Sequence, residues 1–103
     1  MEQEALEKRL KNFLDEEGRL KAFPAKRSMK NLALAYLAGK FQPGRRYSEA
    51  EVNQLLEQWH VFRDPATLRR ELYHSRLLDR ETNGAAYWLA EDGPQAIENL
   101  GTR

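Results

Sequence analysis

The sequence predicts a mainly α fold with a small sheet (α+β): a winged helix-turn-helix with an additional N-terminal helix and a C-terminal β-hairpin wing. Three signals predict it, each marking where an element begins or turns. They are the capping box Ser48-Glu49-Ala50-Glu51, the helix start Asp64-Pro65 and the hairpin dipeptide Asn83-Gly84. The resulting order of helix, short strand, helix, helix, strand, strand is that of a winged helix.

The two helices at the centre of this motif are predicted at about 49–59 and from Pro65 to about Ser75. In the first, the Ser48 hydroxyl can accept from the Glu51 amide while the Glu51 side chain reaches back to the Ser48 amide. Its apolar residues recur at helical spacing: Val52, Leu55, Leu56 and Trp59. Asp64 is the expected N-cap of the second helix, after a turn over 60–63.

The wing is predicted as strands 77–81 and 85–89. A type I′ turn at Asn83-Gly84 would join them, because that turn needs positive φ at both central residues. This loop sets the expected register, in which the facing pairs are Leu78–Leu89 and Arg80–Tyr87. For the second pair we expect a cation–π contact.

Before the capping box, the apolar pattern predicts a helix over about 3–14 and another over about 26–40, with an extended segment at 19–23. Gly18 is expected in a turn with positive φ, and 45–47 is expected as a very short strand. We expect one domain over 1–103, with its core in 19–90, an extra helix within 1–14, and a tail or short helix in 91–103. The helical turns of that last part are expected at 95–100.

Composition narrows the classes of protein. Cysteine is absent, which excludes disulfides, a thiolate nucleophile and a cysteine zinc site. No apolar run approaches the roughly 18 residues of a membrane span, and the acidic N-terminal residues argue against a secretory or transit peptide. We therefore expect a cytoplasmic protein that does not enter a membrane.

Charge is unevenly distributed along the chain. The formal net charge is only +1, but residues 24–47 carry six cations and no acid, while residues 90–102 carry acids and no base. A basic middle indicates a local site for an anion. The alternative, which the sequence leaves open, is an ordinary solvated surface.

Several blocks of the chain resemble the bacterial domain-of-unknown-function family 2087, over roughly residues 13–89. They are Phe23-Pro24-Ala25-Lys26-Arg27, the run from Phe41 to Asn53, Asp64-Pro65-Ala66-Thr67-Leu68-Arg69-Arg70-Glu71-Leu72, Leu78-Asp79-Arg80 and Tyr87-Trp88. The family occurs alone or appended to ArsR-type regulators, so the resemblance implies a bacterial protein in a transcriptional context. It implies no catalytic activity and supplies no assigned site residues. A domain attached to a separate DNA-binding domain would suit a sensing or pairing role.

The helix that follows Asp64 is the candidate recognition helix. At 100° per residue, Leu68 and Leu72 face the core, Arg70 and His74 point away, and Thr67 lies at the edge. Recognition helices read base edges in the major groove, and arginine is their commonest specific reader. Thr67, Arg70 and His74 are therefore candidate DNA contacts, and a solvated helix face is the alternative.

Lys26, Arg27 and Lys30 crowd the start of the helix at 26–40, where positive charge opposes the helix dipole. We interpret them as candidate phosphate contacts, with Arg45 and Arg46 extending the patch. Solvated lysines are again the alternative.

The other arginines have structural uses. Arg69 is expected to pack beside the core and pair with Glu49, Glu51 or Asp79, between which the sequence cannot choose. Arg76, in the last turn of its helix, suits the helix dipole.

Enzymatic signals are weak. His60 and His74 lack metal-ligand spacing, and no serine lies in a nucleophile elbow. We expect no enzyme, metal or cofactor. The first hypothesis is a DNA-binding transcriptional regulator of winged-helix type, acting as a homodimer on duplex DNA. The alternative is a winged-helix interaction or sensor module without DNA contact, since a net charge of +1 is small for a nucleic-acid binder.

Overall fold

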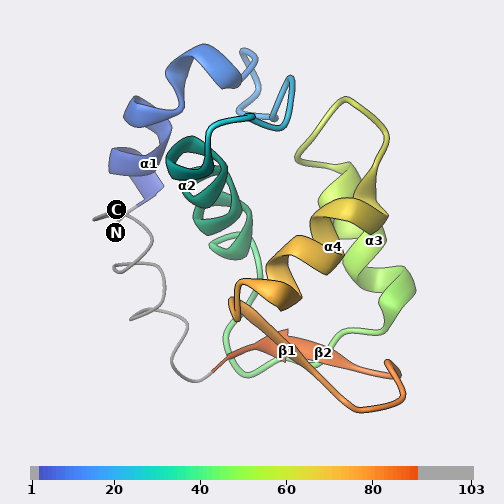
Figure 1. Cartoon of the computed structure of the whole chain (residues 1–103). Helices are drawn as coiled ribbons and strands as arrows, with labels where there is room; N and C mark the ends of the chain where they lie inside the picture. Colours follow the sequence, from blue (N-terminus) through green and yellow to red (C-terminus); the bar gives the residue numbers. More distant parts are fainter. Residues whose placement is uncertain (1–2, 91–103) are drawn as a thin grey trace.

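The computed structural model describes residues 3–90, and Figure 1 shows their arrangement. Within this part of the chain the fold is mainly α, with one small antiparallel sheet of two strands, which confirms the predicted class at that level. The elements are α1 (Gln3–Arg9), the 3-10 helix η1 (Lys11–Phe13), α2 (Arg27–Ala38), α3 (Glu49–Glu57), α4 (Pro65–His74), β1 (Leu78–Arg80) and β2 (Tyr87–Leu89). The helical turns predicted at 95–100 lie outside the described residues.

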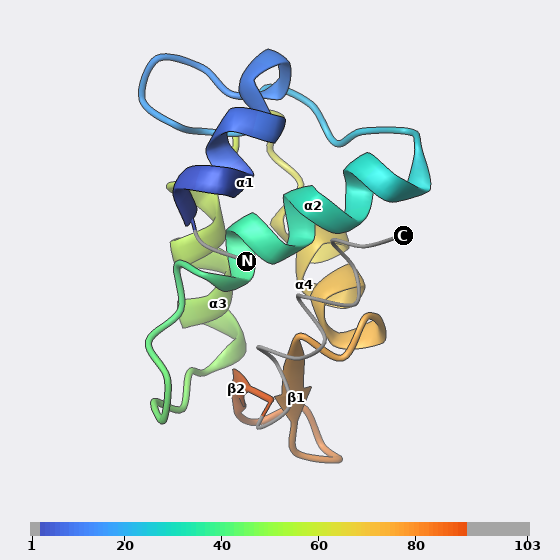
Figure 2. The same ribbon diagram turned by 90° about the vertical axis from the view of Figure 1, so that its left-hand side faces the viewer.

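The central element is α2, which lies between α1 and α4 in both views (Figures 1 and 2). Every residue from Asn31 to Ala38 is buried, as expected for a helix that is covered on all sides. Leu6 and Leu10 of the N-terminal segment are fully buried in the same apolar cluster. The first helix, predicted as an addition to a core over 19–90, therefore contributes to that core.

The predicted helix over 3–14 is wrong in its last turn. The α-helix ends at Arg9, and the short helix η1 follows it. Leu14 is extended, with φ −110° and ψ 144°, because it forms a β-bridge with Leu20. A helix continuing through Leu14 would lose this pairing.

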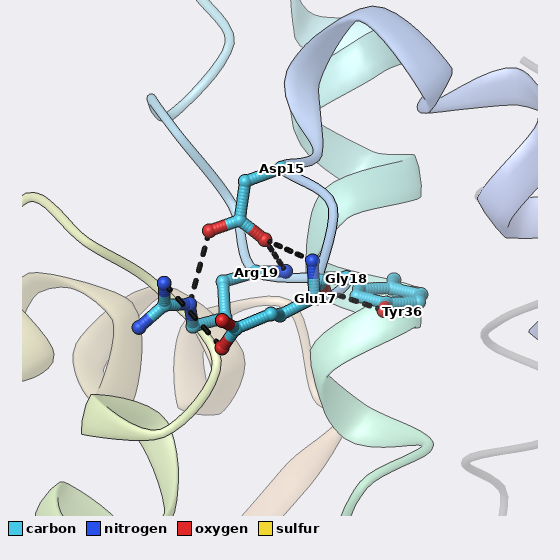
Figure 3. A network of polar contacts seen from close by, with 5 residues as sticks. All are labelled: Asp15, Glu17, Gly18, Arg19 and Tyr36. Carbon is cyan, nitrogen blue, oxygen red and sulfur yellow. Dashed lines mark hydrogen bonds and ion pairs between the residues drawn. The ribbon is translucent and has the colours of Figure 1, made fainter.

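The turn between these two leucines is closed by one carboxylate (Figure 3). Asp15 Oδ1 accepts from the backbone amides of Glu17 and Arg19 at 2.9 and 2.8 Å, and Arg19 Nε donates to Asp15 Oδ2 at 3.0 Å. The amide of Arg19 is the main cause of a lowered pKa at Asp15. Gly18 has the predicted positive φ, +79°, and its carbonyl accepts from the Tyr36 hydroxyl at 2.6 Å, which fastens the turn to α2.

Three isolated bridges make the remaining strand-like contacts. Leu20 pairs with Leu14 on one side and with His60 on the other. The extended segment predicted at 19–23 reduces to this residue, because a bend follows at Lys21 and Ala22. Tyr47 exchanges both backbone hydrogen bonds with Tyr87 of β2, at 2.8 and 2.7 Å. The strand predicted at 45–47 therefore reduces to this one bridge.

The hairpin has the predicted register but not the predicted turn. Among the described residues near the loop, only Gly84 has a positive φ (+73°), so Asn83 does not adopt a type I′ conformation. The Gly84 amide donates to the Glu81 carbonyl at 2.8 Å, and the Glu81 amide donates to the Ala86 carbonyl at 3.0 Å. The Asn83 side chain instead accepts from the amide two residues later. The paired residues are Leu78–Leu89, Asp79–Trp88 and Arg80–Tyr87.

Candidate nucleic-acid interface

The start of α4 is fixed by a buried histidine. The His60 side chain is 4% exposed, and its Nδ1 lies 2.6 Å from the Leu56 carbonyl oxygen, while its Nε2 accepts from the Asp64 amide at 2.9 Å. The carbonyl can only accept, so Nδ1 carries the proton. Asp64 then caps the helix by accepting from the Thr67 amide at 3.2 Å, as predicted. From the sequence, His60 was predicted only to lie in the turn over 60–63 and to lack metal-ligand spacing, so this role was not foreseen.

Two residues of α4 make polar contacts with neighbouring helices on opposite sides. On the α3 side, Arg69 is mostly buried, donates to Asn53 Oδ1 at 2.5 Å and pairs with Glu49 at 3.4 Å. This resolves the three acids predicted for Arg69 in favour of Glu49. On the α2 side, Glu71 pairs with Arg27 at 4.0 Å. The face of α4 between these contacts and away from the core is left to solvent.

That outward face carries the residues predicted for it. Arg70 and His74 are exposed, and Thr67 is partly exposed. Arg70 Nη2 approaches the Thr67 hydroxyl at 3.5 Å. The Thr67 hydroxyl is the main cause of a lowered pKa at Asp64, followed by the Thr67 amide, with a smaller contribution from the Arg70 charge.

The arginines of residues 19–90 fall into two groups, those with a carboxylate partner and those without one. Five of the nine have a carboxylate within 4.0 Å: Arg19, Arg27, Arg45, Arg46 and Arg69. Four have none among the described residues: Arg63, Arg70, Arg76 and Arg80. Arg70 lies on α4, and Arg63 and Arg76 lie within two residues of its ends. Arg80 lies on β1, with its guanidinium over the Tyr73 ring of α4. Arginines without a carboxylate partner among the described residues therefore gather around this helix.

The predicted cation–π contact between Arg80 and Tyr87 is wrong. Arg80 faces Tyr87 across the hairpin, but its guanidinium lies 4.5 Å from the ring centroid of Tyr73, on α4. Tyr87 is 3% exposed and its backbone pairs with Tyr47, so its ring is largely covered. The neighbouring hydroxyls of Tyr73 and then Tyr87 raise the pKa of Arg80. Sequence periodicity could not find this contact, because it joins two different elements.

The start of α2 carries the predicted cations. Lys26 is the N-cap residue and makes no side-chain capping bond, and the first turn of the helix has no acid. Arg27 is 67% exposed and reaches Glu71, which brings it alongside α4. Lys30 lies over the Phe23 ring at 5.1 Å. Lys26 is exposed and has no side-chain partner within residues 3–90.

Arg45 and Arg46, which were predicted to extend this patch, lie in the loop between α2 and α3. Arg45 pairs with Glu51 at 3.4 Å, and Arg46 is bonded to Glu81. Arg46 also covers the Trp88 ring, 4.3 Å from its centroid. Like Arg27, each of these guanidinium groups has a carboxylate partner, whereas Lys26 and Lys30 have none within residues 3–90.

The described part of the chain has no group of metal ligands but has an open groove at the end of α4. It contains no cluster of three or more His, Cys, Asp or Glu residues that could hold a metal ion. An open groove of about 460 Å³ runs past the end of α4, lined by Tyr73, His74, Arg76, Leu78, Asp79 and Ala90. None of the helices in residues 3–90 is long and apolar enough to cross a membrane.

The family model described as an uncharacterized protein conserved in bacteria (DUF2087) matches residues 19–89. The chain belongs to the DUF2087 family. The resemblance seen in the sequence is thereby confirmed, with α1 outside the matched range. No curated protein and no solved structure matches this DUF2087 chain.

Proposed function

We propose that this DUF2087 protein is a DNA-binding transcriptional regulator of the winged-helix type, without catalytic activity. The order of α2, the Tyr47 bridge, α3, α4, β1 and β2 supports this fold, because in a winged helix the short strand after the first helix joins the sheet of the wing. In this arrangement α4 is the recognition helix.

The observation that carries the proposal is the outward face of α4. It presents Thr67, Arg70 and His74, while contacts on both flanks hold the helix in place. Arginines without a carboxylate partner gather around this helix, and those that have one lie mostly elsewhere. An exposed arginine on a rigid helix suits bidentate contact with guanine.

The start of α2 supplies the phosphate contacts in this proposal. Lys26, Arg27 and Lys30 lie there with no acid in the first turn, and free amides at a helix start favour an anion. The Arg27–Glu71 contact brings this end of α2 next to α4. Because the net charge is only +1, such local contacts must supply the affinity.

The test is a titration of fluorescent duplex DNA at low salt, read by anisotropy. Wild-type protein is expected to bind with an affinity that falls as salt rises. Arg70→Ala should weaken binding by about 1 to 3 kcal/mol. Arg45→Ala is the matched control, because it also removes one exposed arginine but one that Glu51 neutralises, and it should bind nearly as wild type.

Absence of binding by folded wild-type protein would overturn the proposal and favour a winged-helix interaction or sensor module. The homodimer stays a prediction, to be checked by sedimentation equilibrium. The apolar stripe of α1 packs on α2 of the same chain, so this stripe is not available to a second copy.

A further inference from the structure

Two arginines near the hairpin are stacked on aromatic rings but differ in their partners. Arg46 lies over Trp88 and is bonded to Glu81. Arg80 lies over Tyr73, and no carboxylate of the described residues is within 4.0 Å of it. Stacking on a ring restricts the guanidinium without neutralising it. Arg80 therefore offers a held, solvent-exposed positive charge, whereas Arg46 does not.

The position of Arg80 relates it to the proposed recognition helix. Tyr73 is three residues after Arg70 on α4, and residues at this spacing are neighbours on a helix surface. The Tyr73 ring thus holds the Arg80 guanidinium within about one helical turn of Arg70. A hairpin residue and a helix residue thereby present two free guanidinium groups on neighbouring parts of one surface.

We infer that Arg80 is a phosphate-binding residue for the backbone of duplex DNA and that Tyr73 is its positioning residue. The inference rests on the proposed function and assigns different roles in DNA binding to Arg70 and Arg80. Arg70 projects from a helix and reads bases, so its loss changes sequence preference. Arg80 is held against a ring at the side of that helix and contacts the backbone, which carries no sequence information directly.

The salt dependence of binding separates these roles. Each phosphate contact contributes about 0.9 to the slope of log affinity against log salt. Arg80→Gln is therefore expected to lower the magnitude of that slope by about 1, and to weaken binding to duplexes of different sequence by the same factor. Arg46→Gln is the matched control, since it also removes an arginine stacked on a ring, and its slope should equal that of wild type.

Two variants test the positioning role. Tyr73→Leu removes the ring and its hydroxyl, and should reduce the slope in the same direction as Arg80→Gln. Tyr73→Phe keeps the ring and should restore most of the wild-type slope. In the double variant with Arg80→Gln, Tyr73→Leu should have no further effect on the slope. Thermal denaturation checks that all variants are folded.

The outcomes separate the inference from the proposal it rests on. If wild type binds DNA and Arg70→Ala weakens it, but Arg80→Gln and Arg46→Gln have the same slope, the inference is wrong and the proposed function stands. An Arg80→Gln loss confined to certain sequences would also overturn it, because that result marks a base contact. If wild type binds no duplex even at low salt, both are overturned.

Discussion

The starts of α4 and α2 differ in whether side chains cap their free backbone amides. Each helix start leaves amides without intrahelical partners. At α4, the Asp64 carboxylate accepts from one of them, Pro65 removes another, and His60 holds the Asp64 amide. At α2, Lys26 occupies the N-cap position and its side chain accepts nothing.

This difference in capping follows from how each helix is stabilised. α2 is stabilised by the burial of every residue from Asn31 to Ala38, so its start can carry cations that oppose the helix dipole. α4 buries fewer residues, namely Leu68 and Leu72. Its position therefore depends more on the capping contacts at its start. A basic, uncapped helix start is costly locally and is explained if it meets an anion.

The largest change in stability is expected when burial is removed from α2. Leu34 is fully buried, and Leu34→Ala should lower the free energy of unfolding by about 2 to 5 kcal/mol, because it removes buried methyl groups and leaves a cavity. Urea denaturation measures the change. Lys26→Ala, at the start of the same helix, should change it by no more than about 0.5 kcal/mol. Comparable losses in the two variants would contradict the account of α2.

The next largest effect is expected at the turn before α4. His60→Ala leaves the Leu56 carbonyl and the Asp64 amide without side-chain partners, at a cost of about 1 to 3 kcal/mol in unfolding free energy. The control is His74→Ala, since His74 is exposed and should contribute little to stability. A His60→Ala variant as stable as His74→Ala would show that the ring does not hold α4.

Loss of the α4 cap should have a smaller effect that depends on pH. Hydrogen bonds from Thr67 lower the pKa of Asp64, so the carboxylate stabilises the fold at neutral pH and this contribution is lost as the pH falls below about 4. Asp64→Ala should lower the melting temperature at pH 7, and the difference from wild type should disappear in acid. A difference that persists unchanged at pH 3 would contradict this cause.

The smallest expected change in stability has the opposite sign. Lys26→Asp places a capping side chain at the start of α2 and should stabilise the protein by about 0.5 kcal/mol. The same variant should weaken DNA binding, because it replaces a proposed phosphate contact with an acid. Lys21→Asp is the control: it makes the same change of charge at an exposed lysine outside any helix. A Lys26→Asp variant that is more stable and binds equally well would sink the functional explanation of the basic start.

Local signals predicted most of the fold. The capping box at Ser48, the Asp64-Pro65 start and the strand register were all recoverable, since each depends on residues close together in the sequence. The end of α1 was not, because Leu14 leaves the helix to pair with Leu20. The turn type at Asn83 also failed, although the register did not depend on it.

The candidate site was less predictable than the fold. Periodicity correctly placed Arg70 and His74 on the outward face of α4. It could not reveal that Arg46 is neutralised by Glu81 or that Arg80 lies over Tyr73, since these contacts join different elements. The number of cations in a stretch of sequence therefore does not show which of them are free to bind an anion. The fold shows it, because it determines which arginines have a carboxylate partner.

Binding of DNA by α4 is tested most directly by a ¹⁵N-HSQC titration of the protein with duplex DNA at low salt. We predict that the largest amide shifts fall on the outward face of α4 and the start of α2, at Thr67, Arg70, His74 and Arg27. Shifts confined to α1 or the Asp15 turn, or none at DNA concentrations that saturate a non-specific binder, would contradict the claim that α4 binds DNA.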